Sequence, residues 1–385
     1  GYQLWPSSIV NKFKPNYFPT RDFVRDFGDA VRANDMKYGL YYSGGVDVTY
    51  RPGKIHPIDL ITTSVLPIIG ESVVPEGEDY AKYCHDQIKE LIDNYQPAII
   101  WNDISYPEKG DAPGLYDYYK SKVPYGQMNN RFGNLIPGDF ETPEYIELNA
   151  PQNKKWETVR GMSESFGYNQ LDDETDIIDP IELRKMFSRV IANGGNLLLN
   201  VSITASGEIK EDSRKSLDKF GWWIYTNKEA IYKSTFRRPS SAKSTTGTAR
   251  NVYFTVREDN TYLFFMDSIQ ENSDVTVFDF TNEKEQPIIV LGPDSTQTLN
   301  WTNIDGNLKI QFKNLGELAY PIVVRIGNDL NVTPTSLISN QQKYNLNIFP
   351  NPASDFIKIN GDNESLSKIK SVLITNSIGQ EIKSL

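Results

Sequence analysis

The chain has 385 residues, a formal net charge of −10 at neutral pH and 38% hydrophobic residues. This length and apolar content suffice for one sizeable core and at least one further domain. Acidic residues outnumber basic ones, 50 to 40, and no long basic run is present, which argues against a nucleic-acid-binding protein. No apolar stretch approaches the roughly 18 to 20 residues that a membrane span needs. Cys84 is the only cysteine, so an intrachain disulfide is excluded.

The first part of the chain alternates segments with helical and strand-like patterns. Apolar residues keep helical spacing over residues 21–34 and again over residues 79–95. A β-rich run at residues 38–45 follows the first of these segments, and a continuous apolar run at residues 97–103 follows the second. Runs of the second kind are typical of strands buried on both faces of a parallel sheet. We therefore expect two successive helix-then-strand units.

A third unit is indicated by helix start and stop signals. Asp179 can cap a helix whose first turn contains Pro180, the stretch 193–195 ends it, and the apolar run 196–201 predicts the next strand. Strands that alternate with helices form a parallel sheet, either a closed barrel or an open doubly wound sheet. Because no GxGxxG motif follows any strand, we predict an α/β fold in which residues 1–234 form a (β/α)8-like TIM barrel.

The rest of the chain is β-rich. Residues 235–327 consist of short β-rich runs separated by Asn, Asp and Gly, which predicts an antiparallel β-sandwich. Residues 328–342 are rich in Asn, Ser, Thr and Gln and have the composition of a linker. Residues 343–385 alternate like a small β domain. The sequence thus predicts three globular parts and one linker.

The candidate chemistry lies in carboxylates near the ends of the predicted barrel strands. Two carboxylates across a sugar-sized cleft are the minimum for hydrolysis of a glycosidic bond. Asp103 ends an apolar strand, so its side chain would emerge at the catalytic face of a barrel with Trp101 two residues before it. A strand-end aspartate can equally cap the next segment or form an ion pair. For the second carboxylate the residues alone leave three candidates open, namely Asp139, Glu141 and Glu144.

A set of short motifs follows in order along residues 1–234. They are Tyr38-Gly-Leu-Tyr-Tyr-Ser-Gly-Gly45, Ile100-Trp-Asn-Asp103 with Pro107-Glu-Lys-Gly110, Asn130-Arg-Phe-Gly133, Thr142-Pro-Glu-Tyr145, Trp156-Glu-Thr158, Ser165-Phe-Gly-Tyr-Asn169 and Asn193-Gly-Gly-Asn-Leu-Leu-Leu-Asn-Val201. Each motif alone is weak, but the set, in this order, resembles the family 29 α-L-fucosidases.

The resemblance implies a retaining exo-α-L-fucosidase that needs no cofactor and acts on terminal α-L-fucosyl linkages of oligosaccharides or glycoprotein glycans. The aspartate of the Trp-Asn-Asp motif is the family's nucleophile, which implies that Asp103 forms a covalent glycosyl-enzyme. The Thr-Pro-Glu-Tyr segment is similar to the one that carries the family's acid/base, which implies this role for Glu144. Because this loop varies, Glu141 and Glu157 are the fallback candidates.

The same resemblance places four residues on positions that line the fucose pocket: Tyr41, Trp101, Arg131 and Phe166. Fucose has a methyl group in place of a 6-hydroxyl, so aromatic faces can pack against it while Arg131 donates to ring hydroxyls. For Tyr41 and Phe166 the alternative is that they are ordinary core aromatics.

The histidines depart from the family pattern. The family binds its sugar with a histidine early in the barrel and with a His-His pair before the stretch that matches residues 1–5, whereas this sequence has only His56 and His85, neither of which matches. We expect the chain to start after that pair, so the first barrel strands lie outside it and the barrel cannot close by itself. The alternative function is therefore an inactive fragment that binds fucose or glycans.

The remaining titratable residues are expected to have structural roles. We expect both histidines to be structural or solvated, and Cys84 and His85 cannot share a proton because adjacent helical residues point apart. The acidic run 172–176 is expected to be a solvated loop and not a metal site.

The C-terminal module contains the specific stretch Phe349-Pro-Asn-Pro-Ala-Ser-Asp355. It resembles the sorting domain of the type IX secretion system, although the module ends before the final strands usually seen. The resemblance implies that the type IX machinery is a partner. It also implies a secreted or cell-surface protein of a Bacteroidota-type bacterium.

Overall fold

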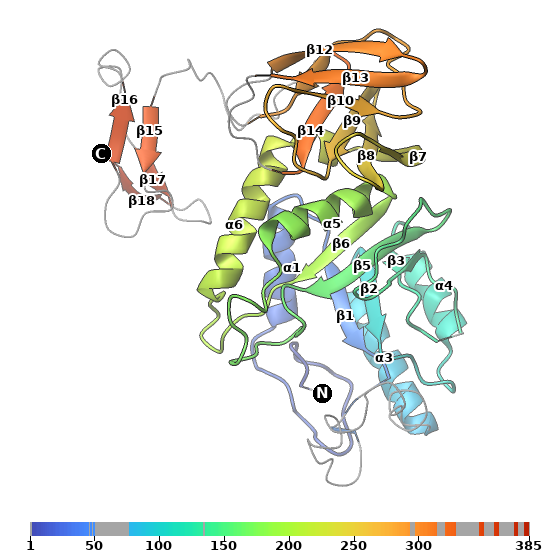
Figure 1. The fold of residues 1–385 in the computed structure, drawn as a ribbon. Helices are drawn as coiled ribbons and strands as arrows, with labels where there is room; N and C mark the ends of the chain where they lie inside the picture. The colour runs from blue at the N-terminus through green and yellow to red at the C-terminus, as the bar shows by residue number, and fades with distance from the viewer. Residues whose placement is uncertain are drawn as a thin grey trace. The chain divides into compact units, whose positions relative to one another are not determined.

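The computed structural model separates into two units, Gly1–Asn328 and Asp329–Leu385 (Figure 1). In the first unit it describes residues 2–45, 47, 49–50, 77–133, 135–292, 297–313 and 320–328. In the second it describes the backbone of four strands, β15 (Leu346–Phe349), β16 (Lys358–Gly361), β17 (Leu373–Thr375) and β18 (Glu381–Ser384).

The described residues of the first half of unit 1 include six parallel strands in sequence order: β1 (Gly39–Ser43), β2 (Ile99–Asp103), β3 (Gln127–Met128), β4 (Phe140–Glu141), β5 (Lys155–Gly161) and β6 (Gly195–Asn200). Hydrogen bonds join β1, β2 and β3 into one sheet and β4, β5 and β6 into another. A parallel bridge between Asn129 and Phe140 links the two sheets. The result is the barrel-like series of strands that the alternating pattern predicts.

The helices of this half are α1 (Phe23–Ala33), α3 (Glu78–Tyr95), α4 (Ala112–Lys122), α5 (Pro180–Ala192), α6 (Glu211–Thr226) and α7 (Lys228–Ile231). Capping side chains determine where several of them begin. Asp22, Asp111 and Asp179 each accept a hydrogen bond from a backbone N–H of the first turn of α1, α4 and α5. The sequence predicted the start of α5 because Pro180 follows its cap, whereas it gave no prediction for α4 or α6.

In the second half of unit 1 the described residues form an antiparallel sheet of eight strands, which are β7 (Thr235–Lys243), β8 (Arg250–Arg257), β9 (Asn260–Phe265), β10 (Ser273–Val277), β11 (Ile288–Val290), β12 (Gln297–Ile304), β13 (Asn307–Phe312) and β14 (Ile322–Ile326). Their order is β10-β13-β12-β11-β14-β9-β8-β7. An antiparallel bridge between Ser244 and Val277 connects the two ends of this series. The sheet therefore curves back on itself, which agrees with the antiparallel β domain that the sequence predicted.

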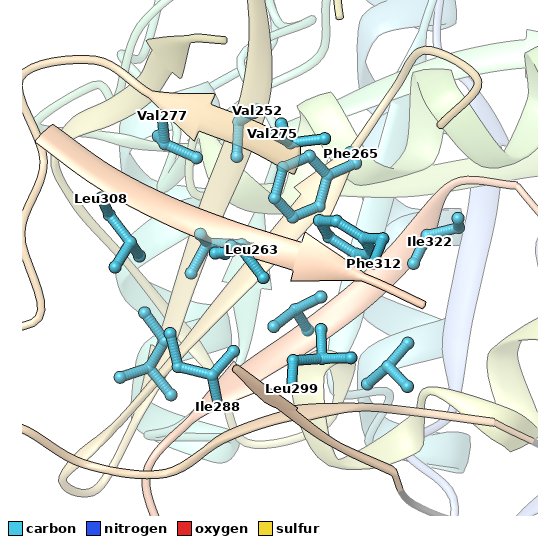
Figure 2. Close-up of a cluster of buried hydrophobic side chains, with 14 of the residues drawn as sticks. Val252, Leu263, Phe265, Val275, Val277, Ile288, Leu299, Leu308, Phe312 and Ile322 are labelled. Atoms are coloured by element: carbon cyan, nitrogen blue, oxygen red, sulfur yellow. The ribbon is translucent and has the colours of Figure 1, made fainter. Parts of the chain in front are cut away.

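The curved sheet encloses its own hydrophobic core (Figure 2). Side chains from all parts of the sheet meet there, and Val252, Leu263 and Phe312 are fully buried. Alternation along each strand directs every second side chain inward, as in β13, where Leu308 and Ile310 are buried while the residues between are not. This core is separate from the clusters around the parallel strands.

A second cluster joins the barrel half to the β half. Trp223 of α6 packs against Phe264 of β9, with 6.2 Å between ring centroids, and both side chains are fully buried. The indole N–H of Trp223 donates to the backbone oxygen of Pro321 at 2.9 Å. The Arg325 guanidinium, 2% exposed, forms an ion pair with Glu229 of α7 at 3.0 Å. Truncating a buried aromatic of this size typically costs about 3–5 kcal/mol, so this shared core holds the two halves together.

In unit 2, β15 pairs with β16 and β17 pairs with β18, each antiparallel. The predicted linker, residues 328–342, lies outside the described residues except for Asn328, and residues 350–355 of the sorting stretch lie outside them entirely. No helix in the described part of the chain is long and apolar enough to cross a membrane.

Candidate active site

Asp103 is the last residue of β2, and both of its carboxylate oxygens are hydrogen-bonded. Tyr41 of β1 donates its hydroxyl to Oδ2 at 2.7 Å, and Arg131 donates from Nη1 to Oδ1 at 2.8 Å. Strand alternation directs Trp101 and Asp103 to the same side of β2, and both line one cavity. The side chain of Asp103 is 20% exposed, so a small molecule in the cavity can reach it.

The backbone that follows Asp103 is strained. Ile104 and Ser105 adopt φ values of 55° and 66°, and positive φ is a genuine outlier for a β-branched residue such as Ile104. The fully buried Asn102 holds this turn, because its Nδ2 donates to the backbone oxygens of Ser105 and Arg131, each at 2.8 Å. Asn102 therefore fixes the turn next to Asp103 and the segment that carries Arg131.

Arg131 bridges two carboxylates. Its Nη1 contacts Asp103, and its Nη2 forms an ion pair with Oε2 of Glu144 at 2.8 Å. Thr142 orients the guanidinium, since its hydroxyl accepts from Nε at 2.9 Å and its backbone oxygen accepts from Nη2 at 3.1 Å. The two candidate catalytic carboxylates are thus separated by a single guanidinium group.

Glu144 lies on the loop after β4, and its side chain is 43% exposed. The next residue, Tyr145, has a φ of 53° and anchors the loop to β5. Its backbone N–H donates to the oxygen of Val159 at 2.8 Å, and its hydroxyl accepts from the backbone N–H of Gly161 at 3.0 Å. This anchoring keeps Glu144 at the cavity while its carboxylate stays accessible.

The other candidate carboxylates lie in different environments. Asp139 is committed to structure: it accepts from the backbone N–H of Met128 at 2.8 Å and pairs with Lys120 at 2.9 Å. Partial burial acts to raise the pKa of Asp139, but these bonds outweigh it and lower the pKa. Glu141 does not line the cavity that contains Asp103. Glu157 does, from β5, and burial raises its pKa despite the hydrogen bond that it accepts from Trp101.

The cavity has a volume of about 1380 Å³ and an aromatic wall. Besides Asp103 and Glu144, its lining includes the four residues that the sequence predicted for sugar binding, namely Tyr41, Trp101, Arg131 and Phe166. The rings of Tyr41 and Trp101 stack with 5.7 Å between centroids. Tyr41 is 60% and Phe166 39% exposed, so neither is a core aromatic.

The hydroxyl of Tyr41 turns inward to Asp103 although its ring is largely exposed. Burial of that hydroxyl and its hydrogen bond to the Asp103 carboxylate raise the pKa of Tyr41 well above its usual value. Tyr41 therefore stays protonated and donates to Asp103 across the physiological pH range.

Cys84 and His85 lie in α3, away from the residues that line this cavity. Cys84 is fully buried, and burial raises the pKa of its thiol, which keeps it unreactive. Nδ1 of His85 lies 3.4 Å from the hydroxyl of Tyr106. His56 lies outside the described residues. Among the described residues no three His, Cys, Asp or Glu side chains form a group that could hold a metal ion.

Comparison with known proteins identifies the family. A family model described as alpha-L-fucosidase matches residues 1–229, more than half of the chain. The chain belongs to the α-L-fucosidase family.

Relatives within the α-L-fucosidase family include animal and microbial enzymes. Tissue alpha-L-fucosidase of Macaca fascicularis is 25% identical over 286 residues, which are 69% of this chain and 56% of the relative. Alpha-L-fucosidase of Dictyostelium discoideum is 29% identical over 309 residues, which are 74% of this chain and 63% of the relative. The chain thus spans little more than half the length of these relatives.

Solved structures agree with this α-L-fucosidase assignment. The Thermotoga maritima alpha-fucosidase in complex with a mechanism-based inhibitor is similar with a TM-score of 0.72 and 29% identity, over 85% of this chain and 73% of that one. An alpha-L-fucosidase isoenzyme of Paenibacillus thiaminolyticus, 21% identical with a TM-score of 0.66, shares the fold.

Sequence reasoning missed the residues that hold the predicted ones in place. Asn102, Thr142 and Tyr145 all lie inside motifs that were singled out for a carboxylate one or two residues away. The one sign of their role in the sequence was a polar side chain close to a candidate carboxylate. The partners that they bind lie 11 to 29 residues away, so the sequence did not reveal these contacts.

We predict that Asp139→Asn lowers the free energy of unfolding by roughly 1.5–3 kcal/mol at neutral pH, because it removes charged hydrogen bonds. Since folding lowers the pKa of Asp139, its stabilising effect is present above the pKa of the unfolded chain and is lost as the pH falls through the folded value. Urea unfolding of both proteins at a series of pH values measures this. Asp29→Asn, at an exposed pair, should change stability by about 0.5 kcal/mol or less. A wild-type-to-variant difference that does not shrink at acid pH would contradict the prediction.

Proposed function

We propose that this chain carries the catalytic centre of a retaining exo-α-L-fucosidase that hydrolyses terminal α-L-fucosyl linkages of glycans. The observation that carries the proposal is the Arg131 bridge, which sets Asp103 and Glu144 side by side in one aromatic-lined cavity. Two adjacent carboxylates suit a double displacement, in which one attacks the sugar and the other transfers protons. The relatives from Thermotoga maritima are described in complex with fucose and with a mechanism-based inhibitor, which supports this reading.

In the first step, Glu144 donates a proton to the leaving oxygen while Asp103 attacks the anomeric carbon, so that the glycosidic bond breaks and a covalent fucosyl-enzyme forms. In the second step, Glu144 removes a proton from a water molecule, the water oxygen attacks the anomeric carbon and Asp103 leaves. Fucose is released with its anomeric configuration retained. For the first step Glu144 must leave Arg131 and turn to the leaving oxygen, which its 43% exposure permits.

Sugar recognition uses the two kinds of surface in the cavity. The exposed rings of Tyr41 and Phe166 offer apolar contact for the methyl group of fucose, and Trp101 supports the ring of Tyr41 from behind. Once Glu144 has turned away, the Nη2 of Arg131 is available to donate to a ring hydroxyl. L-Galactose carries a hydroxymethyl group in place of that methyl, so aryl α-L-fucosides should be cleaved much faster than aryl α-L-galactosides.

We predict that Asp103→Asn lowers turnover of an aryl α-L-fucoside on the order of 10⁴-fold or more, because the nucleophile is removed. Glu144→Gln should cost about 10²–10⁴-fold with a poor leaving group and much less with an activated one, which needs no proton. Mass spectrometry after treatment with 2-fluoro-fucosyl fluoride should locate the adduct on Asp103.

The matched control is Asp93→Asn on α3, which lies away from the cavity and should leave turnover unchanged. An adduct on another residue, or an Asp103→Asn variant that is as active as the wild type, would overturn the assignment.

We also propose that two further β/α units complete the parallel barrel between β6 and β1. Among the described residues, β1 pairs only with β2 and β6 only with β5, whereas a closed barrel has eight strands and no edge. A hollow of about 860 Å³ beside β1 is lined by apolar side chains of α1, and there Phe27 is 66% exposed. Such edges and apolar faces are normally covered.

The test compares turnover and fucose binding by this chain and by a version that carries any residues encoded before Gly1. We expect the longer version to cleave an aryl α-L-fucoside faster, because a complete wall holds the sugar more firmly. Equal turnover by the two versions would show that strands β1 to β6 suffice for catalysis. Fucose binding without cleavage by either version would instead indicate a glycan-binding protein.

For unit 2 we propose a role in export by the type IX secretion machinery, with the mature protein outside the cell or on its surface. Its two antiparallel hairpins support a small β module. In a Bacteroidota-type host we expect the full chain in the medium or on the cell surface, and a version that lacks residues 343–385 inside the cell. Fractionation followed by immunodetection measures this, and equal export of both versions would refute the role.

A further inference from the structure

Trp101 touches both groups that hold Asp103. Its ring stacks on that of Tyr41, with 5.7 Å between centroids and 20° between planes, and the guanidinium carbon of Arg131 lies 4.5 Å from the ring centroid. Tyr41 and Arg131 in turn donate one hydrogen bond each to the two oxygens of Asp103. The Trp101 ring therefore constrains both donors, in addition to the hold that Thr142 has on Arg131.

The orientation of that ring is fixed by one hydrogen bond. The Trp101 indole N–H donates to Oε1 of Glu157 at 3.1 Å, which links β2 to β5 across the cavity. Trp101 is only 8% exposed, so an unpaired indole N–H would be costly. Rotation of the ring would break this bond.

The environment of Glu157 is unusual for an acid. It lines the cavity as Val159 of the same strand does, and within the described residues it forms no ion pair. Its neighbours on β5 alternate away from the cavity, as shown by Thr158, whose hydroxyl donates to the backbone oxygen of Ile146. Burial raises the pKa of Glu157. Whether protonated or not, its carboxyl retains an oxygen that can accept from Trp101.

We propose that Glu157 is a positioning residue of the fucosidase site: by accepting the indole N–H of Trp101, it fixes the ring that aligns Tyr41 and Arg131 on Asp103. It acts through Trp101 and transfers no proton, so it is not the acid/base, a role for which the sequence left it as a fallback candidate. This role rests on the proposed function, because the alignment of Asp103 matters for catalysis only if Asp103 is the nucleophile of a fucosidase.

The test compares Glu157→Gln, which keeps an acceptor oxygen, with Glu157→Met, which has a similar size and no such oxygen. In the full chain labelled with ¹⁵N at the tryptophan indoles, Trp101→Phe identifies the Trp101 signal. We expect this signal to stay in place in the Gln variant and to move upfield in the Met variant, since its hydrogen bond is lost. Thr158→Val, next to Glu157 and facing away from the cavity, should leave the signal unmoved.

The kinetic arm uses an aryl α-L-fucoside. Glu157→Met should lower kcat about 10–100-fold with little change in KM, as expected for misplacement of a reacting group, while Glu157→Gln should stay within about threefold. In a Trp101→Phe background, Glu157→Met should cause no further loss of kcat, because there is no indole left to orient.

Two results would overturn the inference: a Trp101 signal that does not move in Glu157→Met, or a Gln variant whose kcat falls as far as that of Met, which would mean that the acid itself takes part. If Glu157→Met does not fold, Glu157→Gln still tests the proposal. A displaced Trp101 signal or a large loss of kcat in Glu157→Gln would contradict it. If the wild type shows no turnover, the proposed function fails, and the indole signals still report whether Glu157 positions Trp101.

Discussion

The site depends on one guanidinium group that is shared by two carboxylates. Two like charges this close would repel each other in a partly buried cavity, and Arg131 between them offsets that repulsion. For this the Arg131 guanidinium must keep one orientation. Thr142 fixes that orientation, because its hydroxyl and its backbone oxygen both accept hydrogen bonds from Arg131. The rest of the site supports the two carboxylates in the same way. The buried amide of Asn102 holds the strained turn after Asp103, and bonds to β5 anchor Tyr145, which follows Glu144 with a positive φ.

Much of this architecture was predictable from local pattern. The continuous apolar run before Asp103 gave β2, and the cap-and-proline signal gave the start of α5. Very short strands, and helices without a clear apolar face, could not be predicted in this way. Strands β3 and β4 have two residues each, which is too few for any periodicity to appear.

For the site, the sequence predicted the residues that line the cavity but not the ones that orient them. Asp103, Tyr41 and Arg131 meet because three strands end at the same edge of a parallel sheet, a constraint that applies to any barrel. The choice among Asp139, Glu141 and Glu144 depended instead on which carboxylate lines the cavity of Asp103, and only Glu144 of the three does so. Lys120 pairs with Asp139 from a helix 19 residues earlier, and no local pattern encodes that contact.

The shared core between α6 and the antiparallel sheet has an evolutionary consequence. Trp223 belongs to the barrel half, but its ring packs against Phe264 and its indole N–H donates to Pro321, both in the β half, so neither half has a complete surface of its own where they meet. Domains joined by a loose tether can be exchanged between genes as modules. Here an exchange of the β half would expose part of the interior of the barrel half, and the two are therefore expected to be inherited together.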